Sequence, residues 1–164
     1  MKTITPQYTF KNRVIAIASH PFLDCVDGKR DLVIRRKDAP KYQIVKVYDN
    51  HDYELDPIGF AELAFIPCAE ISDTEDLHVV TALIATDLDL PEGQSVSIGA
   101  PVSRTVGKYQ IYEDIIEISL VDIGHLNGAH VIRYEDWNHV IKALYESAPL
   151  ILKKILGDLS NAKN

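Results

Sequence analysis

The stretch "YQIYEDIIEISLVDIGHLNGAHVIRYEDWNHVIKALYES", residues 109–147, indicates how this chain is organised. Its first part holds two runs rich in β-branched and aromatic residues, which favour strands. The runs meet at Asn127 and Gly128, a pair that tolerates positive φ angles and is typical of tight hairpin turns. The spacing of apolar residues then becomes helical, at Trp137, Val140, Ile141 and Leu144. We therefore expect a hairpin followed by a helix.

The next segment, "SAPLILKKILGDLS" at residues 147–160, predicts a second, short helix. Ser147 suits the N-cap, where its side chain accepts a hydrogen bond from a free backbone N–H. Pro149 then falls in the first turn, where its missing N–H does no harm, and Gly157 is a typical helix stop.

Toward the N-terminus the pattern is that of strands. "RVIAIAS" (13–19) is an apolar run typical of a buried strand. "DLVIRR" (31–36) and "YQIVKVYD" (42–49) flank the turn formers of "KDAPK", so we expect a second hairpin there. "GFAELAFIP" (59–67) ends in Pro67, which lacks a backbone donor, and this favours an edge strand.

Residues 77–88, "LHVVTALIATDL", combine signals for both kinds of structure. Ser72 followed by Glu75 fits a capping box, which favours a helix. The β-branched side chains favour a strand, and the strand-like "QSVSIG" that follows tips the prediction toward a strand.

Strands thus come first and helices last. This order favours an α+β fold with a mostly antiparallel sheet, built from the N-terminal and central hairpins and covered on one face by two C-terminal helices. The chain has 164 residues, with no internal repeat and no Gly/Ser-rich or Pro-rich linker. We therefore expect a single domain over residues 1–164.

Targeting signals and cysteine chemistry are sparse. No apolar run approaches the roughly 18 residues of a membrane span, and the start, "MKTITPQYTF", lacks the apolar region of a secretory signal. Cys25 and Cys68 are the only cysteines, too few for a disulfide framework and outside any zinc-ligand pattern. We expect a cytoplasmic protein in which both are small residues in or near the core.

The charge is distributed unevenly along the chain. The net charge is -7, but residues 1–46 carry ten Lys/Arg and four Asp/Glu, whereas residues 47–103 carry twelve acidic residues and no Lys or Arg. Either the basic first third neutralises this acidic middle, or the acidic middle faces a cationic partner. The basic cluster at residues 28–41 is also compatible with nucleic-acid binding. It lacks aromatic residues for stacking on bases, however, and the chain as a whole is acidic, so nucleic-acid binding is not favoured.

The acidic stretch at residues 45–60 is the first candidate for chemistry. Asp49 and His51 would lie on one side of an extended chain and offer metal ligands. Asx residues also start turns by bonding their own backbone, and this explains "DNHD" without a metal. The turn interpretation is favoured, with a partner-contact surface and a metal or acid/base site as the alternatives.

Three other groups of residues allow chemistry but have simpler explanations. His125 and His130 flank the Asn-Gly turn and would face each other across it. In that position they would be able to bind a metal ion or to respond to pH by changing their protonation. His20 and Cys25 are close enough in sequence for a thiolate–imidazole pair. The acidic run Glu113, Asp114 and Glu117 is more typical of a solvated strand face than of an acid/base pair.

No nucleotide-binding, zinc-protease, serine-hydrolase or calcium-loop motif is present, so the sequence predicts no catalytic residue, no metal and no cofactor. The leading hypothesis is a non-enzymatic, acidic protein that binds a basic protein. Bacterial immunity proteins and antitoxins that inhibit nuclease toxins have similar size and acidity, an analogy that rests on charge and length alone. The expected contact residues are Asp49, Asp52, Glu54, Asp56, Asp73, Glu75 and Asp76.

Two alternatives remain open. One is a small-molecule or metal-dependent hydrolase with a nonstandard site, in which Asp49, His51 and a residue from another element converge. The other is a subunit of a larger assembly, such as a phage or mobile-element particle, which would carry a large apolar surface patch.

Overall fold

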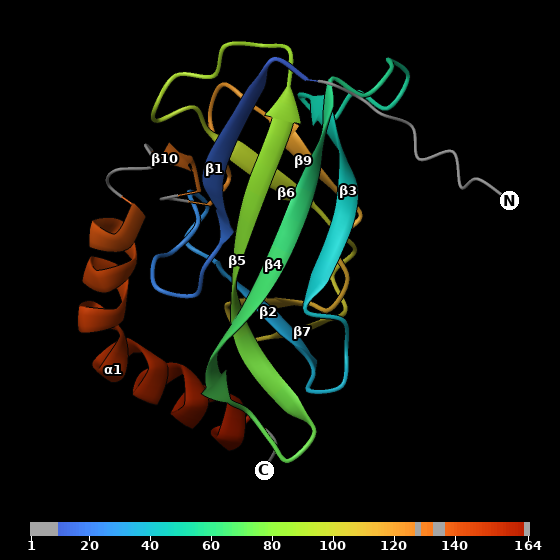
Figure 1. Cartoon of the computed structure of the whole chain (residues 1–164). Coiled ribbons are helices and arrows are strands. Elements are labelled where there is room, and N and C mark those ends of the chain that lie inside the picture. Colours follow the sequence, from blue (N-terminus) through green and yellow to red (C-terminus); the bar gives the residue numbers. More distant parts are fainter. Residues whose placement is uncertain (1–9, 127–128, 133–136, 163–164) are drawn as a thin grey trace, which may run out of the picture.

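The computed structural model describes residues 10–126, 129–132 and 137–162 (Figure 1). Along these residues run ten strands and one helix. The elements are β1 (Asn12–Ser19), β2 (Arg30–Arg36), β3 (Tyr42–Asp49), β4 (Gly59–Glu70), β5 (Glu75–Thr86), β6 (Val96–Gly99), β7 (Arg104–Val106), β8 (Tyr109–Tyr112), β9 (Glu117–Leu120), β10 (Val131–Ile132) and α1 (Trp137–Asn161). The α+β prediction is confirmed in broad outline.

All ten strands join one sheet. Its main path runs β6-β9-β3-β4-β5-β2-β8-β7, and β1 pairs with both β5 and β10. Most neighbouring pairs are antiparallel, but β2 with β8 and β3 with β9 are parallel. The sheet is therefore mixed, and both parallel pairs join strands more than 60 residues apart in sequence.

The predicted hairpin between residues 31–36 and 42–49 is wrong. β2 pairs with the first part of β5 and with β8, whereas β3 pairs with β4 and β9. The segment "KDAPK" therefore connects two separate parts of the sheet. A turn-forming composition indicates where the chain reverses, but it does not determine which strands pair afterwards.

β4 and β5 form the long central ribbon of the molecule, so the prediction of an edge strand at residues 59–67 is also wrong. The missing N–H of Pro67 is tolerated because the register between β4 and β5 shifts between Pro67 and Ala69, where the ladder is interrupted. Residues 77–88 lie largely in β5, as a strand. Ser72 does accept a hydrogen bond from the N–H of Glu75, but the bond closes the β4–β5 turn rather than starting a helix.

The predicted hairpin around Asn127 and Gly128 centres on two residues outside the described ones. Nearby, the N–H of Ala129 donates to the carbonyl of Leu126 at 3.2 Å. On either side, however, β9 pairs with β3 and β6, and β10 pairs with β1. The two runs therefore reverse direction without forming a ladder with each other in the described part.

The C-terminal region is one helix of 25 residues rather than two. Pro149 lies inside α1 instead of opening a second helix, and Gly157 lies within it instead of ending it. Figure 1 shows α1 changing direction along its length, as expected when a proline removes one hydrogen bond and its ring crowds the preceding turn. Packing against the sheet stabilises the helix across Pro149 and Gly157, two residues that are unfavourable inside a helix.

The main core lies between the inner face of β1, β3, β4 and β5 and the strands and loops behind it. It contains Ala16, Val47, Leu63, Ile84 and Ile118, all 1% exposed or less. The outer face of the same strands is divided. Toward the β4–β5 turn, α1 covers it with Ile151, Leu152, Ile155 and Leu159, which pack against residues of β2, β4, β5 and β8. Toward the other end, no helix or strand of the described residues covers the outer face.

Candidate binding surface

The open part of the outer face is an apolar surface formed by four neighbouring strands. The strand registers align Ile44, Glu62, Leu83 and Ile15 in one row, and Lys46, Phe60, Ala85 and Arg13 in the next. Side chains directly opposite each other on adjacent strands have Cβ atoms about 5 Å apart, so each row forms continuous contact across the sheet. We call these two rows, together with Phe10, the open face.

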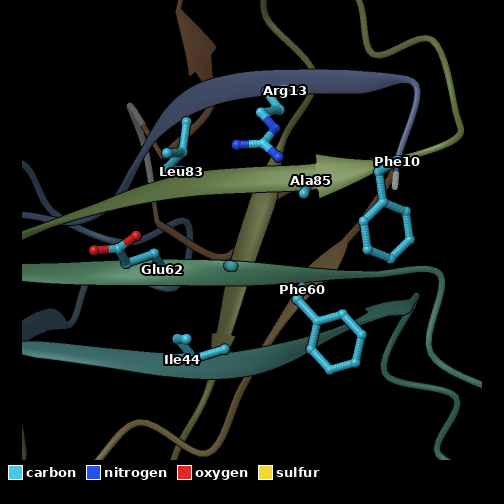
Figure 2. A pocket seen from close by; sticks show the side chains of 8 residues that line it. Phe10, Arg13, Ile44, Phe60, Glu62, Leu83 and Ala85 are labelled. Atoms are coloured by element: carbon cyan, nitrogen blue, oxygen red, sulfur yellow. The ribbon is translucent and has the colours of Figure 1, made fainter. Parts of the chain in front are cut away.

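The open face is hollowed. A hollow of ≈ 370 Å³ is lined by residues of both rows and by Phe10 (Figure 2). Figure 2 shows the rings of Phe10 and Phe60 at one end of this hollow, with Ile44 and Leu83 further along it. The two ring centroids are 6.0 Å apart. Ile44 is 72% exposed and Leu83 is 40% exposed, although both lie in the middle of the sheet.

Three charged side chains project from this apolar surface. Arg13 lies on β1, Lys46 on β3 and Glu62 on β4, and within the described residues none of them forms an ion pair. A partner that covers the open face would therefore meet two cations and one anion inside an apolar surround. Contiguous apolar surface of this kind, interrupted by a few polar groups, is typical of protein interaction sites.

An acidic loop, residues 49–58, joins β3 to β4 beside the open face. Its backbone makes a sharp turn in which Asn50 and His51 adopt φ angles of 50° and 57°, a left-handed conformation that is uncommon outside glycine. The N–H of Asn50 donates to the carbonyl of Leu120 at 2.8 Å, and the N–H of His51 donates to Oγ of Ser119 at 3.0 Å. The loop is thus fastened to β9.

The buried carboxylate of Glu117 fixes the same loop from below. Glu117 is 1% exposed, and its Oε1 lies 2.6 Å from Nδ1 of His51 and accepts a hydrogen bond from the Tyr53 hydroxyl at 2.9 Å. Its Oε2 accepts from the Ser119 hydroxyl at 2.8 Å. A side chain on Gly99 would overlap Glu117, so the glycine makes room for the carboxylate. Partial burial, and then the bond to Glu117, raises the pKa of Tyr53, which therefore remains a donor.

This arrangement has a limited chemical capacity. A histidine held by a buried carboxylate is the orientation that a general base requires. In the described residues, however, Nε2 of His51 has no hydrogen-bonded hydroxyl or thiol that it would activate. The hydrolase alternative expected Asp49 in such a group; the structure brings Glu117 to His51 instead. The interpretation of Glu117 as part of a solvated strand face is wrong, because β9 turns it inward.

The seven expected contact residues lie at two opposite ends of β4. Asp49, Asp52, Glu54 and Asp56 are exposed on the acidic loop, and Asp73, Glu75 and Asp76 lie in or beside the β4–β5 turn. β4 has 12 residues, so about 40 Å of strand separates the two groups. The first group alone is close to the open face along the chain.

The basic residues of the first third neutralise little of the acidic middle. Nζ of Lys37 lies 2.6 Å from Oε2 of Glu70 and 3.6 Å from Oδ1 of Asp76. Arg36 pairs with Asp38, and Arg30 with Asp24, both acids of the first third itself. Among the described residues, no Lys or Arg forms an ion pair with Asp49, Asp52, Glu54 or Asp56.

Arg35 is buried, and its guanidinium contacts an aromatic ring and backbone carbonyls rather than a carboxylate. Its guanidinium lies 3.7 Å from the centre of the Phe65 ring and donates to the carbonyls of Glu113 and Pro40. Burial lowers the pKa of Arg35. This side chain therefore serves packing, and it is not available to neutralise the acidic loop.

The remaining candidate groups are separated. His125 lies beside the β1–β2 connection, whereas His130 forms a bridge with Ser95. His20 stacks on Phe22 and accepts a hydrogen bond from its N–H, while Cys25 lies near Asp31 and His125. Both cysteines are free, Cys25 buried and Cys68 half-buried, as predicted for small residues in or near the core.

Sequence reasoning missed the open face and the role of Glu117. One signal for the open face is present in "YQIVKVYD", where Tyr42 and Ile44 alternate with Val45 and Val47, so that both faces of the strand carry apolar side chains. The partner of Glu117 has no comparable signal, because His51 is 66 residues away in the chain.

Comparisons with protein-family models, with curated proteins and with solved structures find no match for this chain. Within its described residues, no helix has the length and apolarity needed to cross a membrane. The function therefore has to be argued from the surface itself.

Proposed function

We propose that this protein is a binding protein without catalytic activity, and that it docks a basic protein through the open face and the acidic loop. The observation that carries the proposal is the exposed row of Ile44 and Leu83 on a strongly paired central sheet. Burying such side chains under a partner removes apolar area from water, a gain of roughly 25 cal/mol per Å² from which the entropic cost of association is subtracted.

The acidic loop supports a cationic partner. Its four carboxylates form no ion pair with a Lys or Arg in the described part of the chain, so their field extends into solvent. Uncompensated charges of one sign beside an apolar centre raise the association rate with a partner of opposite sign and disfavour acidic competitors. The anchoring by Glu117 supports this role, because a preorganised loop loses little entropy on binding.

More specifically, we propose that the protein is an inhibitor of the immunity or antitoxin type and that its basic partner is a nuclease toxin. Acidic side chains that occupy a nucleic-acid site compete directly with phosphates. The support for this finer form is the size and acidity of the chain, together with the exposed acidic loop.

The experiment is a capture of partners with three forms of the tagged protein: the wild type, an Ile44→Ser/Leu83→Ser double variant, and a Leu150→Ser control. Leu150 is 82% exposed on α1, away from the open face. The products of neighbouring genes are the first partners to test. A captured protein is then purified, and its Kd is measured at low and high salt.

We expect a partner with a net positive charge whose affinity falls as salt rises, since exposed charges are screened over about 10 Å at 0.1 M salt. The double variant should weaken binding by about tenfold or more, the scale of losing interface anchors. The Leu150→Ser control should bind as the wild type does. Salt-insensitive binding that survives the double variant would contradict the proposal.

A further inference from the structure

The connection between β1 and β2 meets the segment after β9 at a cluster that the binding surface does not use. Cys25 forms an antiparallel bridge with Leu126. The N–H of Val26 donates to the carbonyl of His125 at 2.9 Å, and the N–H of Cys25 donates to the carbonyl of Lys29 at 2.6 Å. These bonds hold Cys25 and His125 beside each other, although they are 100 residues apart in sequence.

Three potential ligands converge here. The Sγ atom of Cys25, a carboxylate oxygen of Asp27 and a ring nitrogen of His125 all lie within 4.8 Å of one another. Cys25 is buried, His125 is half-buried and Asp27 is exposed, so the group is reachable from solvent on one side. Asp27 also accepts a hydrogen bond from the N–H of Lys29, which fixes the carboxylate within the turn.

A fourth side chain reaches the cluster from the interior. Asp31 on β2 is 3% exposed, and its Oδ2 lies 3.9 Å from Nε2 of His125. Its Oδ1 is buried without a hydrogen bond of good geometry among the described residues, although the Cys25 thiol and the Tyr112 hydroxyl lie close to the carboxyl group. A buried carboxylate oxygen without such a bond is costly, and a bound cation is one way in which proteins satisfy it.

Metal binding would also change the protonation of the thiol. Cys25 is buried, and a divalent ion that binds its sulfur would displace the proton and compensate the neighbouring carboxylates.

We propose that Cys25, Asp27 and His125, with Asp31 as the fourth ligand, form a zinc site. One sulfur, one imidazole nitrogen and two carboxylate oxygens match the ligands that Zn²⁺ takes in tetrahedral sites, at about 2.0–2.3 Å from the metal. In that geometry neighbouring ligand atoms are roughly 3.5 Å apart, so the three atoms that lie within 4.8 Å of one another would draw closer around the metal, and the Asp31 carboxylate would turn toward it. With four protein ligands the site would be structural, tying the β1–β2 connection to residues 125–126.

Cobalt(II) binding tests the site, because Co²⁺ replaces Zn²⁺ and reports its ligands by absorption. Full-length protein is stripped with a chelator and titrated with Co²⁺, and Zn²⁺ is then added in competition. We expect a thiolate-to-cobalt charge-transfer band in the near ultraviolet, visible bands of tetrahedral intensity, and loss of both on addition of Zn²⁺. Zn²⁺ should also raise the Tm of the stripped protein.

Variants assign the ligands. Cys25→Ser should abolish the charge-transfer band, whereas Cys68→Ser, at the other free cysteine, should keep it. Asp27→Asn changes an exposed residue and should fold normally, yet weaken cobalt binding, and Asp31→Asn should weaken it by roughly 10- to 100-fold. Circular dichroism checks that each variant is folded.

The proposal is overturned if the folded wild type shows no charge-transfer band at micromolar Co²⁺. It is also overturned if the band is lost in Cys68→Ser, or if folded Asp27→Asn and His125→Gln bind Co²⁺ as the wild type does.

Discussion

The two ends of the outer sheet face have the same architecture but different surroundings. Toward the β4–β5 turn, Ile66, Cys68 and Val79 project outward and lie beneath α1. Toward the acidic loop, Ile44 and Leu83 project outward from the same face and remain exposed. The described part of the chain therefore supplies a cover for one apolar region and leaves the other open.

This difference separates two roles for apolar residues on one sheet. Where α1 covers the face, the side chains contribute to the stability of the fold, because they leave water on folding. Where the face is open, their burial awaits another molecule, so removing them should affect binding far more than stability. The acidic loop is fixed next to the open end by a buried carboxylate rather than by a helix.

The largest expected effect is on the covered end. Ile155 on α1 is 0% exposed, and Ile155→Ala should lower the free energy of unfolding by about 2–5 kcal/mol, since it leaves a cavity between α1 and the sheet. Urea denaturation measures the loss. The matched control is Leu150→Ala on the same helix, where an exposed side chain should change stability by no more than about 0.5 kcal/mol. Equal losses would mean that α1 does not cover the face as described.

An intermediate effect is expected at the anchor of the acidic loop. Glu117→Gln keeps the shape of the side chain but replaces one acceptor by an NH₂ group that faces His51, Tyr53 or Ser119. We expect a loss of about 1–3 kcal/mol, the cost of a buried polar group without its partner. Hydrogen exchange should also quicken at residues 50–53. Unchanged exchange in a destabilised variant would show that Glu117 supports the core but not the loop.

The smallest effect on stability is expected at the open end. Ile44→Thr should change the free energy of unfolding by no more than about 0.5 kcal/mol, because the side chain is already in water. Its neighbour Val45 faces the core, and Val45→Thr buries a hydroxyl at a cost of about 1–3 kcal/mol. A similar loss at both positions, measured by urea denaturation, would show that the open face is covered within this chain.

Local patterns predicted the elements better than their partners. The β-branched residues of β5 and the apolar spacing of α1 were sufficient to assign a strand and a helix. The partners of β2 and β3 were not predictable in the same way, because β8 and β9 are distant in sequence. The composition of a strand does not determine which other strand it pairs with. Pro149 and Gly157 suggested helix boundaries, but packing of Ile151 and Ile155 overrides those local preferences.

The same limit applies to the candidate sites. The acidic loop was visible as a run of carboxylates, and its polar-turn character follows from Asp and Asn chemistry. Glu117 was not identified, because a single acid in an apolar strand is equally compatible with either face until the register is known. Cys25 and His125 share no spacing motif, and only the bridge between their segments brings them together.

Site-specific photocrosslinking tests the central claim most directly. A photoreactive amino acid is placed at position 44 on the open face or at position 150 on α1, in the cells from which the chain comes. We predict that position 44 crosslinks to one basic protein and that position 150 does not. Crosslinking of the same protein with equal yield from both positions, or from position 150 alone, would contradict the open face as the binding surface.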